Sequence, residues 1–490
     1  MQAVFAFYLL PFAFKIGGMG FIGEEEQKGI ITTGEIRGIF KELLSFDLHV
    51  ITDGFIGNQW GISRCLFLSV LFIGLLSVLS LQIPNLLLFA FGWVLGTSPI
   101  WLPVLTLIIA WKVWIWYAHS RYLFKRDTML LEVKMPRDIT RSPRAMENAL
   151  SKLWTDSGET TFLNRIWQGQ VRPYFSLEIA SFGGEIHFYI WCWRNWRPNV
   201  EAMMYAYYPE VEMVEVEDYA SKFRFNPDTQ ECFPTDWRYE PRNDAYPIRT
   251  YIEFELDKDP KEEYKIDPLA EVLERMSILK PDEQMWIQII ITMCRDTRHK
   301  KGGAWFETES RYVGLLKDEV EKIREDTVGN LDDPHQQWRR SARVQQYKYT
   351  ELIKAIDRNL GKHPFNVGMR GVYIANAENF SAPGYTGIRW IWRPMGNPQY
   401  MNQMRPRRWG NPFDFPWQDW GDIRWRLMQK RFFDAYRRRS HFYSPWIFPH
   451  NMMSTEVIAT MWHPPSAAVG APGLARIPAK KAEPPANLPK

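Results

Sequence analysis

The chain has 490 residues, which allows about two to four domains. Its 60 basic and 56 acidic residues nearly balance, and a net charge of +4 does not indicate a nucleic-acid-binding protein as a whole. The four cysteines include no CxxC pair, so neither a zinc site nor a disulfide framework is predicted, and a reducing compartment is expected.

Residues 1–64 are predicted to form an N-terminal amphipathic or interfacial region. The apolar start lacks the basic beginning and the small-residue cleavage site of a signal peptide. In the segment EIRGIFKELLSFDL the apolar residues recur at helical spacing, so one helix face can lie on a membrane or on a partner. Packing of that face against the chain's own domain is the alternative.

Residues 65–118 are predicted to form a transmembrane hairpin. Segments 65–83 and 100–117 each match the roughly 20 helical residues that cross a bilayer. The run GTSP at 96–99 indicates a turn, and the short apolar piece 86–95 before it predicts a re-entrant or interfacial segment. A third, tilted span is one alternative for this piece, and a buried core hairpin of a soluble protein is an alternative for the whole run.

Basic residues flank both outer ends of this hairpin, and aromatic residues gather at its second end. By the positive-inside rule both ends lie in the cytoplasm, so we expect a multi-pass protein of the inner membrane with most of the chain cytoplasmic. The predicted cytoplasmic flank is Arg64, Arg121, Lys125 and Arg126. The predicted membrane anchor is defined by Cys65, Ile83, Ile100, Trp111, Trp114, Trp116 and Tyr117.

Residues 123–220 are predicted to form a first α+β lobe. Segment 128–134 reads as a strand, and Ser142-Pro143 then begins a helix. The alternating segments 174–181 and 185–193 flank a Gly-Gly turn and predict a β-hairpin. A helix at 198–207 and a strand at 211–216 complete the order β-α-β-β-α-β, which is that of a split βαβ, ferredoxin-like lobe.

Residues 246–395 are predicted to form a second α+β lobe. Its expected elements are a strand at 248–256, a helix capped by Asp267, and strands at 283–293 and 365–375, with a helical insertion at 300–361. The predicted fold class is therefore α+β: an N-terminal transmembrane helical hairpin followed by two ferredoxin-like lobes, the second with a helical insertion.

Residues 396–465 are rich in Arg, Trp and Pro, a composition that does not indicate a regular core. Arginines interleaved with aromatic residues can contact a protein partner, anionic lipid headgroups or nucleic acid, and internal ion pairing is the alternative. The candidate basic patch is Arg405, Arg407, Arg408, Arg424, Arg426, Arg437, Arg438 and Arg439. Residues 466–490 are rich in Pro, Ala and Lys and predict a linker tail.

Sequence motifs for known chemistries are absent from the chain. It contains no GxxxxGK[ST] phosphate loop, no GxSxG, no HExxH and no GxGxxG, and the nine histidines have no partner at metal-ligand spacing. We therefore expect no catalytic residue, no cofactor and no metal.

Three stretches together resemble a known family. They are LLEVKMPRDITRSPRAMENALSKLW, the pair PYFSLEIASFGGEIHFYIW and VEAMMYAYYPEVEMVEVEDY, and STEVIATMWHPPS with the tail up to Lys490. They resemble the region that precedes the motor in membrane-anchored conjugation or type IV secretion-like ATPases, VirB4/TraC-like or coupling-protein-like. In that family a stretch similar to 480–489 leads into the nucleotide-binding domain, and the Walker motifs of that domain have no positions here.

The resemblance implies a non-catalytic membrane subunit that docks or scaffolds a separate ATPase in a machine for DNA or protein transfer. Its expected partners are membrane lipid and that ATPase, and it would act as an oligomer or within a membrane complex, with nucleic acid contacted indirectly if at all. The alternative is a membrane-bound DNA- or anionic-lipid-binding module that uses the Arg/Trp-rich segment. A truncated gene product without function is a third hypothesis.

Overall fold

The computed structural model describes two compact units, Met1–Leu86 and Leu87–Lys490. In the first unit residues 70–78 are helical, and the predicted N-terminal region, Arg64, Cys65 and Ile83 lie outside the described residues. The described residues are 70–78, 85–136, 139, 141–155, 158–159, 161–241, 243–257, 267–301, 306–328, 347–407, 417, 419–466, 469–470, 472–474 and 476–477.

One long apolar helix, α6 (Leu86–Phe124), runs through the predicted re-entrant segment and the predicted turn at 96–99. Both predictions are therefore wrong. Pro99 cannot donate a backbone hydrogen bond to the Leu95 carbonyl, but the Ser98 hydroxyl donates to that oxygen at 2.6 Å. The Thr97 hydroxyl likewise donates to the Trp93 carbonyl at 2.8 Å. Because side-chain hydroxyls bond to carbonyls around the proline, the helix continues.

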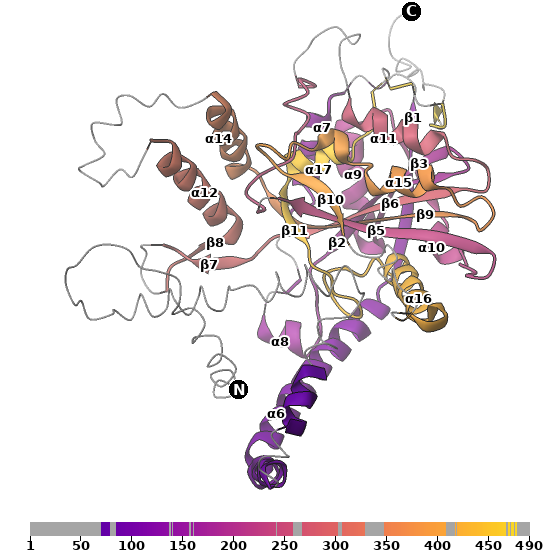
Figure 1. Ribbon diagram of the computed structural model, residues 1–490. Coiled ribbons are helices and arrows are strands. Elements are labelled where there is room, and N and C mark those ends of the chain that lie inside the picture. Colours follow the sequence, from indigo (N-terminus) through magenta and orange to yellow (C-terminus); the bar gives the residue numbers. More distant parts are fainter. Residues whose placement is uncertain are drawn as a thin grey trace, which may run out of the picture. The chain divides into compact units, whose positions relative to one another are not determined.

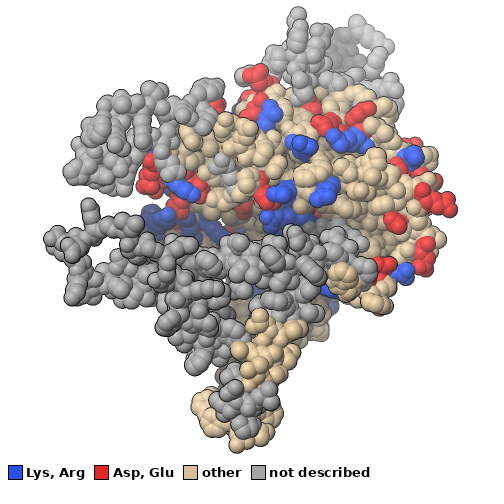
Figure 2. Space-filling model, in the orientation of Figure 1, with Lys and Arg blue, Asp and Glu red and all other residues tan. Residues whose placement is uncertain are grey.

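Among the described residues, one helix is long and apolar enough to cross a membrane, within Phe91–Phe124. Its apolar side chains are exposed; Ile100, for example, is 75% exposed. Over the length of α6 in view, the surface is mostly tan in Figure 2, whereas basic and acidic residues are interspersed over the body. The described residues therefore offer one candidate span and do not support the predicted multi-pass hairpin.

A ten-stranded, mostly antiparallel sheet forms the body (Figure 1). Its spatial order is β10-β5-β9-β6-β2-β3-β1-β12, with β4 also paired to β1 and β11 to β9. The short β12 pairs with β1 in parallel. The strands are β1 (Thr128–Pro136), β2 (Tyr174–Phe182), β3 (Glu185–Trp193), β4 (Glu212–Val216), β5 (Gln230–Glu240), β6 (Gln284–Met293), β9 (Pro364–Asn376), β10 (Gln403–Arg407), β11 (Asn451–Ser454) and β12 (Arg476–Ile477). This mixture of helices with a mostly antiparallel sheet agrees with the predicted α+β class.

The two halves of the sheet repeat one order of elements. The first half is β1, α7 (Pro143–Ser151), β2, β3, α9 (Arg197–Tyr207) and β4, and the second is β5, α11 (Pro268–Ser277), β6, β9, α15 (Ala382–Arg389) and β10. In space the first half runs β4-β1-β3-β2 and the second runs β10-β5-β9-β6. Strands β2 and β6 pair from Tyr174↔Thr292 to Phe182↔Gln284 and join the halves.

The first strand of the second half is β5, and the predicted strand at 248–256 is wrong. Residues 251–257 form turns, and of the alternating apolar residues Ile248 and Leu256 are buried without forming a strand. The Tyr251 backbone N–H is satisfied by the Thr460 hydroxyl at 3.0 Å rather than by a strand. Strand β5 was not predicted from the sequence, because Pro234 lies within it. The described residues of β10 pair with residues 236–240 of β5, and Pro234 lies opposite Val372 of β9.

The insertion between β6 and β9 contains the two expected helices, α12 (Arg311–Val328) and α14 (Tyr347–Leu360). A short hairpin, β7 (Thr297–His299) and β8 (Thr308–Ser310), precedes them. Both helices present apolar stripes to each other, and their shared cluster includes Leu316, Val320, Leu352 and Ile356. The same cluster includes Tyr246, Met401 and Met452, so the two helices share this apolar cluster with residues outside the insertion.

Helices cover both faces of the sheet. One face packs against α7, α9, α11 and α17 (Thr455–Met461) in the largest apolar cluster. The other face is aromatic and lies under α16 (Ile423–Arg437) and α10 (Tyr219–Lys222). Segment 396–465 was not expected to contribute to a regular core, and this expectation is wrong because α16 buries Gln429, Phe432, Phe433 and Tyr436 on one helical stripe.

Candidate functional site

The C-terminal end of α6 packs directly on the body. The indole N–H of Trp114 donates to the Ile166 carbonyl of α8 (Phe162–Ile166) at 3.1 Å. Its ring meets Trp167 edge to face, with the centroids 5.3 Å apart. These contacts fix the helix against a short amphipathic turn of the first half.

Two further contacts hold this junction. Gly169 has φ +65°, and a Cβ on it would lie 2.2 Å from the Ala118 carbonyl oxygen, so only glycine allows this approach to α6. One turn further along α6, Tyr122 packs edge to face on Trp193 of β3 at 6.3 Å. Only residues 125–127 separate α6 from β1. The apolar helix is therefore joined to the sheet without a flexible linker.

A pocket of ≈ 710 Å³ lies between the end of α6 and the aromatic face of the sheet. The face of α6 that carries Tyr117, Ser120, Arg121 and Phe124 forms one wall. The sheet contributes aromatic residues, of which Tyr174 and Trp191 stack at 5.3 Å. The C-terminal end of α16 contributes Asp434, Arg437 and Arg438. The pocket thus combines aromatic walls with guanidinium groups.

Positive charge dominates this pocket. Of its four arginines, Arg438 pairs with Asp434 at 2.8 Å. Arg126 lies over the rings of Tyr122 and Trp193 instead of an acid, and Arg437 donates to the Phe433 carbonyl at 3.3 Å. Among the described residues, Arg121, Arg126 and Arg437 form no ion pair. The pocket therefore keeps uncompensated guanidinium charge.

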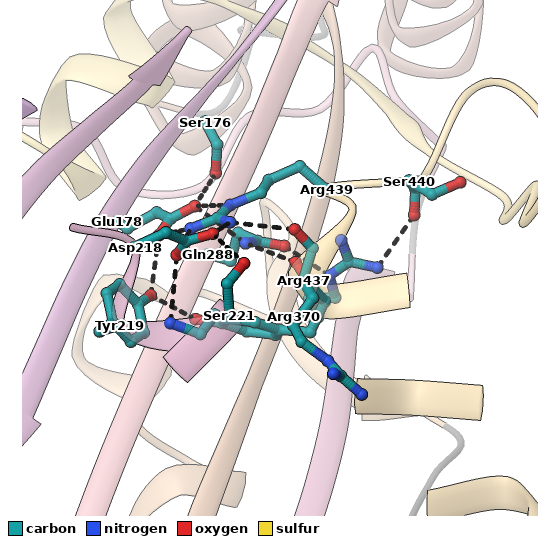
Figure 3. A network of polar contacts seen from close by, with 12 residues as sticks. Ser176, Glu178, Asp218, Tyr219, Ser221, Gln288, Arg370, Arg437, Arg439 and Ser440 are labelled. Atoms are coloured by element: carbon teal, nitrogen blue, oxygen red, sulfur yellow. Dashed lines mark hydrogen bonds and ion pairs between the residues drawn. The ribbon is translucent and has the colours of Figure 1, made fainter. Parts of the chain in front are cut away.

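Beneath this pocket, a buried polar network ties α16 to the centre of the sheet (Figure 3). The Arg439 guanidinium donates to Glu178 of β2 at 3.0 and 3.1 Å and to Asp218 at 2.8 Å. Glu178 also accepts hydrogen bonds from Ser176 at 2.7 Å, Tyr219 at 2.7 Å and Gln288 at 2.9 Å. Every oxygen of this buried carboxylate is thus satisfied.

The second acid of the network, Asp218, keeps its charge. Burial would raise the pKa of Asp218, but the charge and hydrogen bonds of Arg439 outweigh it and hold this pKa below its usual value. The hydroxyl of Ser221 at 2.7 Å and the backbone N–H of Ala220 at 3.1 Å add to this effect. Asp218 is therefore bound to Arg439 and does not neutralise the pocket's other arginines.

Arg370 of β9 is the second buried guanidinium of the network. It donates to Gln288 at 2.6 Å and to the carbonyls of Ala435 and Ser440 at 2.8 and 3.0 Å. Burial lowers the pKa of Arg370 to about 10. Since its bonds go to the end of α16, Arg370 and Arg439 together hold this helix on the sheet.

The structure divides the predicted basic patch among separate places. Arg437 and Arg438 line the pocket, and Arg439 is buried beneath it. Arg405 and Arg407 lie on β10 and pair with Glu240 at 2.8 and 3.2 Å, while Arg426 lies 3.5 Å from Asp228. Arg424 is at the start of α16, where Asp419 accepts its backbone N–H at 2.9 Å. Arg408 lies outside the described residues.

The predicted flank and anchor residues lie along α6 and just after it. Arg121 and Arg126 line the pocket, so the structure brings the flank together with two arginines of the patch. Lys125 is exposed at the end of α6. Ile100, Trp111, Trp114, Trp116 and Tyr117 all lie on α6. Trp114 faces α8, and Trp116 and Tyr117 face the pocket.

Sequence reasoning missed the residues that hold α16 in place, namely Glu178, Gln288 and Arg370. The signal available for Glu178 was its position in a strand whose two faces are both buried. A carboxylate there requires a buried cation. The sequence does not show which of its many arginines supplies that cation.

Among the described residues, no group of three or more His, Cys, Asp or Glu side chains is arranged to hold a metal ion. Comparison with known protein families finds no family model that matches the chain. Comparison with curated proteins finds none with significant similarity.

Proposed function

We propose that this chain is a non-catalytic, membrane-anchored platform that docks a separate ATPase in a conjugation- or type IV secretion-like machine for DNA or protein transfer. The membrane would be the inner membrane, with the body in the cytoplasm. The basic residues Arg121, Lys125 and Arg126 at the body end of α6 support this orientation. The platform would act as an oligomer or within a larger membrane complex.

The observation that carries this proposal is the junction between α6 and the sheet. Trp114, Ala118 and Tyr122, on successive turns of α6, all contact the body. A docking subunit must hold its partner at a set distance from the membrane, and a helix fused to a broad sheet can do so. The hydrogen-bonded network around Arg439 also makes the platform rigid, because it fixes α16 on the sheet, across the pocket from α6.

The architecture of the body supports a structural role. We propose that its two halves are ferredoxin-like lobes, since each has β-α-β-β-α-β order and places its fourth, first, third and second strands side by side. Such a lobe buries one sheet face under two helices and leaves loops and helical insertions for partners. The insertion with α12 and α14, and the segment after β10 with α16 and α17, are additions to this plan.

Affinity purification of the full chain from detergent-solubilised membranes tests the proposal. We expect an ATPase to co-purify, with nucleotide hydrolysis in the complex and none by this chain alone. As a matched control, the Gly169→Ala variant keeps all charged surfaces but disturbs the junction. It should still bind the ATPase, with transfer activity reduced. Recovery of the chain alone in high yield, solubility without detergent, or hydrolysis of nucleotide by the chain alone would overturn the proposal.

A second candidate function is binding of anionic ligands, DNA or lipid, by the Arg/Trp-rich segment. The pocket favours it, because Arg437 of this segment meets Arg121 of the helix flank there and neither has an acidic partner among the described residues. Weaker salt dependence of binding in an Arg437→Gln variant would support this function, and an unchanged salt dependence would count against it.

A further inference from the structure

We propose that the pocket between α6 and the sheet binds the phosphate-bearing headgroup of an anionic phospholipid from the leaflet next to the body. This inference rests on the proposed membrane anchoring by α6, and it assigns the anionic-ligand function to one site and one ligand class. Three independent features of the junction support it: the depth of the pocket, its charge and its shape.

The membrane boundary is marked by apolar residues around α8. Phe162, Leu163 and Trp167 are 60%, 61% and 58% exposed, although a soluble body would not gain from presenting them together. Trp167 is in ring contact with Trp114 of α6. Tryptophans at this position of a membrane helix typically lie at the interface between hydrocarbon and headgroups. The Trp114–Trp167 pair therefore sets the depth at which α8 rests on the lipid.

Arg121 then lies just beyond the headgroup layer, and its long side chain can extend back to the lipid phosphates. It follows Trp114 by seven residues, and a rise of 1.5 Å per residue places it about 10 Å further along the helix. The headgroup layer on one side of a bilayer is about 5–8 Å thick beyond the hydrocarbon core. A pocket that Arg121 and Ser120 line is thus within reach of lipid phosphates, whereas a soluble polyanion would have to approach the membrane surface to enter it.

The chemistry of the pocket fits a phosphate diester. Arg121, Arg126 and Arg437 have no ion pair among the described residues, and guanidinium groups bind phosphate oxygens through paired, charge-assisted hydrogen bonds. The buried hydroxyl of Ser120 makes no hydrogen bond to any described residue and lines the same wall. On rotation of its side chain toward the pocket, this hydroxyl can donate to a phosphate oxygen.

The acids of the pocket are hydrogen-bonded to other groups than these three arginines, although the charge of Asp434 also acts on Arg437. Asp218 is bound by Arg439 beneath the pocket. Asp434 accepts from Arg438 at 2.8 Å and from the Trp446 indole N–H at 2.7 Å. Excess positive charge therefore remains for a ligand of negative charge, and a zwitterionic lipid would gain less from it.

The wall that α6 forms also suits a lipid. Tyr117, Ser120, Arg121 and Phe124 follow one another at helical spacing, so the pocket continues down one face of α6. Below Tyr117 that face is apolar, and an acyl chain can lie along it while the headgroup occupies the pocket. A nucleic acid has no apolar chain that could lie along this face of α6, so the face favours a lipid.

The test uses the full chain purified in detergent and reconstituted into nanodiscs. Native mass spectrometry and fluorescent-lipid titration would compare phosphatidylglycerol with phosphatidylcholine, with inorganic phosphate and a single-stranded oligonucleotide as competitors. We expect tighter binding of phosphatidylglycerol, and at least about tenfold weaker binding in an Arg121→Gln/Arg437→Gln variant. The matched control, Arg405→Gln/Arg407→Gln, removes two arginines that pair with Glu240 and should bind as the wild type does.

Folding of each variant is checked by thermal unfolding, and Ser120→Ala, the smallest change in the pocket, provides a second test if the double variant is unstable. Equal affinity for both lipids, or equal loss in the control, would overturn the proposal. If the oligonucleotide binds more tightly than lipid, and the Arg121→Gln/Arg437→Gln variant weakens that binding, the ligand of the pocket is nucleic acid and the lipid proposal is overturned. Displacement of lipid by inorganic phosphate at comparable concentration would show a soluble phosphate site. If the chain does not enter nanodiscs at all, the anchoring itself fails, which is a separate result.

Discussion

The guanidinium of Arg439 lies in the interior between Glu178 and Asp218, with Nε 3.0 Å from Glu178 Oε1 and Nη2 2.8 Å from Asp218 Oδ1. Arg439 is 1% exposed, and its backbone adopts φ +49°, which is unfavourable for a residue with a side chain. The two ion pairs stabilise this conformation. They attach the end of α16 to β2, the strand at the middle of the sheet.

Replacing Arg439 is expected to destabilise the body strongly. In Arg439→Gln, the Glu178 carboxylate stays buried without its cation, which typically costs about 3–5 kcal/mol of the free energy of unfolding. Chemical unfolding of the detergent-solubilised chain, followed by circular dichroism, measures this loss. The neighbouring Arg438→Gln removes an exposed pair with Asp434 and should cost less than about 1 kcal/mol. Similar losses in both variants would contradict the structural role of Arg439.

Stability should fall as the pH drops below about 6.5, the ordinary pKa of histidine. Burial, together with the positive charge of Arg370, holds the pKa of His441 well below its usual value, and burial also lowers the pKa of His450. The unfolded chain then binds more protons than the folded chain between the two pKa values, so the free energy of unfolding decreases with falling pH. The stabilisation that these two histidines contribute is fully present at pH values above the pKa of histidine in the unfolded chain.

The His441→Gln variant tests this pH dependence. Glutamine keeps a donor for the Pro449 carbonyl, which the imidazole reaches at 3.2 Å, but it does not titrate. Unfolding midpoints measured between pH 7.5 and 5 should then change less with pH than in the wild type. The exposed His299→Gln serves as the control and should leave the pH dependence as it is. If the unfolding midpoint of His441→Gln changes with pH as much as that of the wild type, His441 does not cause the pH dependence of stability.

The Gly169→Ala substitution should loosen α8 from α6. Its Cβ would lie 2.2 Å from the Ala118 carbonyl oxygen, and the residue has φ +65°, so the backbone must move. We expect a loss of about 1–3 kcal/mol and faster tryptic cleavage after the exposed Arg165 in α8. Gly361→Ala is the control, because its Cβ would meet nothing within 4 Å. Unchanged cleavage in Gly169→Ala would show that the junction tolerates the shift.

The depth of α8 can be measured with spin labels. In a Cys65→Ser background, a label at Leu163→Cys should be more accessible to oxygen than to a water-soluble nickel complex, as expected for a lipid-facing site. A label at Ile278→Cys, directly after α11, where the native side chain is also largely exposed, should show the reverse. Aqueous accessibility at both positions would place α8 away from the membrane.

The sequence predicted those elements whose residue pattern is determined by residues nearby in the chain. Strands β1, β2 and β3 alternate, and Gly183 and Gly184 form the turn between β2 and β3. Pro143 marks the start of α7 because it suits the first helical turn. Such signals depend on backbone preferences and burial of one face, so the sequence shows them.

Other elements depend on partners that are distant in the chain. Pro234 lies within β5, opposite Val372 of β9, and Pro99 lies within a helix because Ser98 bonds to the freed carbonyl. The arginines of segment 396–465 indicated an exposed patch, yet Arg439 finds its acids more than 200 residues earlier. Composition cannot show this, since an arginine that faces solvent and one that is buried by a distant acid look alike in sequence.

The pairing of β2 with β6 has a consequence for how the molecule bears load. Both strands are buried along their length, and β6 is mostly apolar. Expressed separately, either half would expose an apolar strand edge that recruits other chains and aggregates. In the intact protein, a force applied to the second half is carried across the β2–β6 pairing as shear on main-chain hydrogen bonds and reaches the first half, which is joined to α6 without a flexible linker.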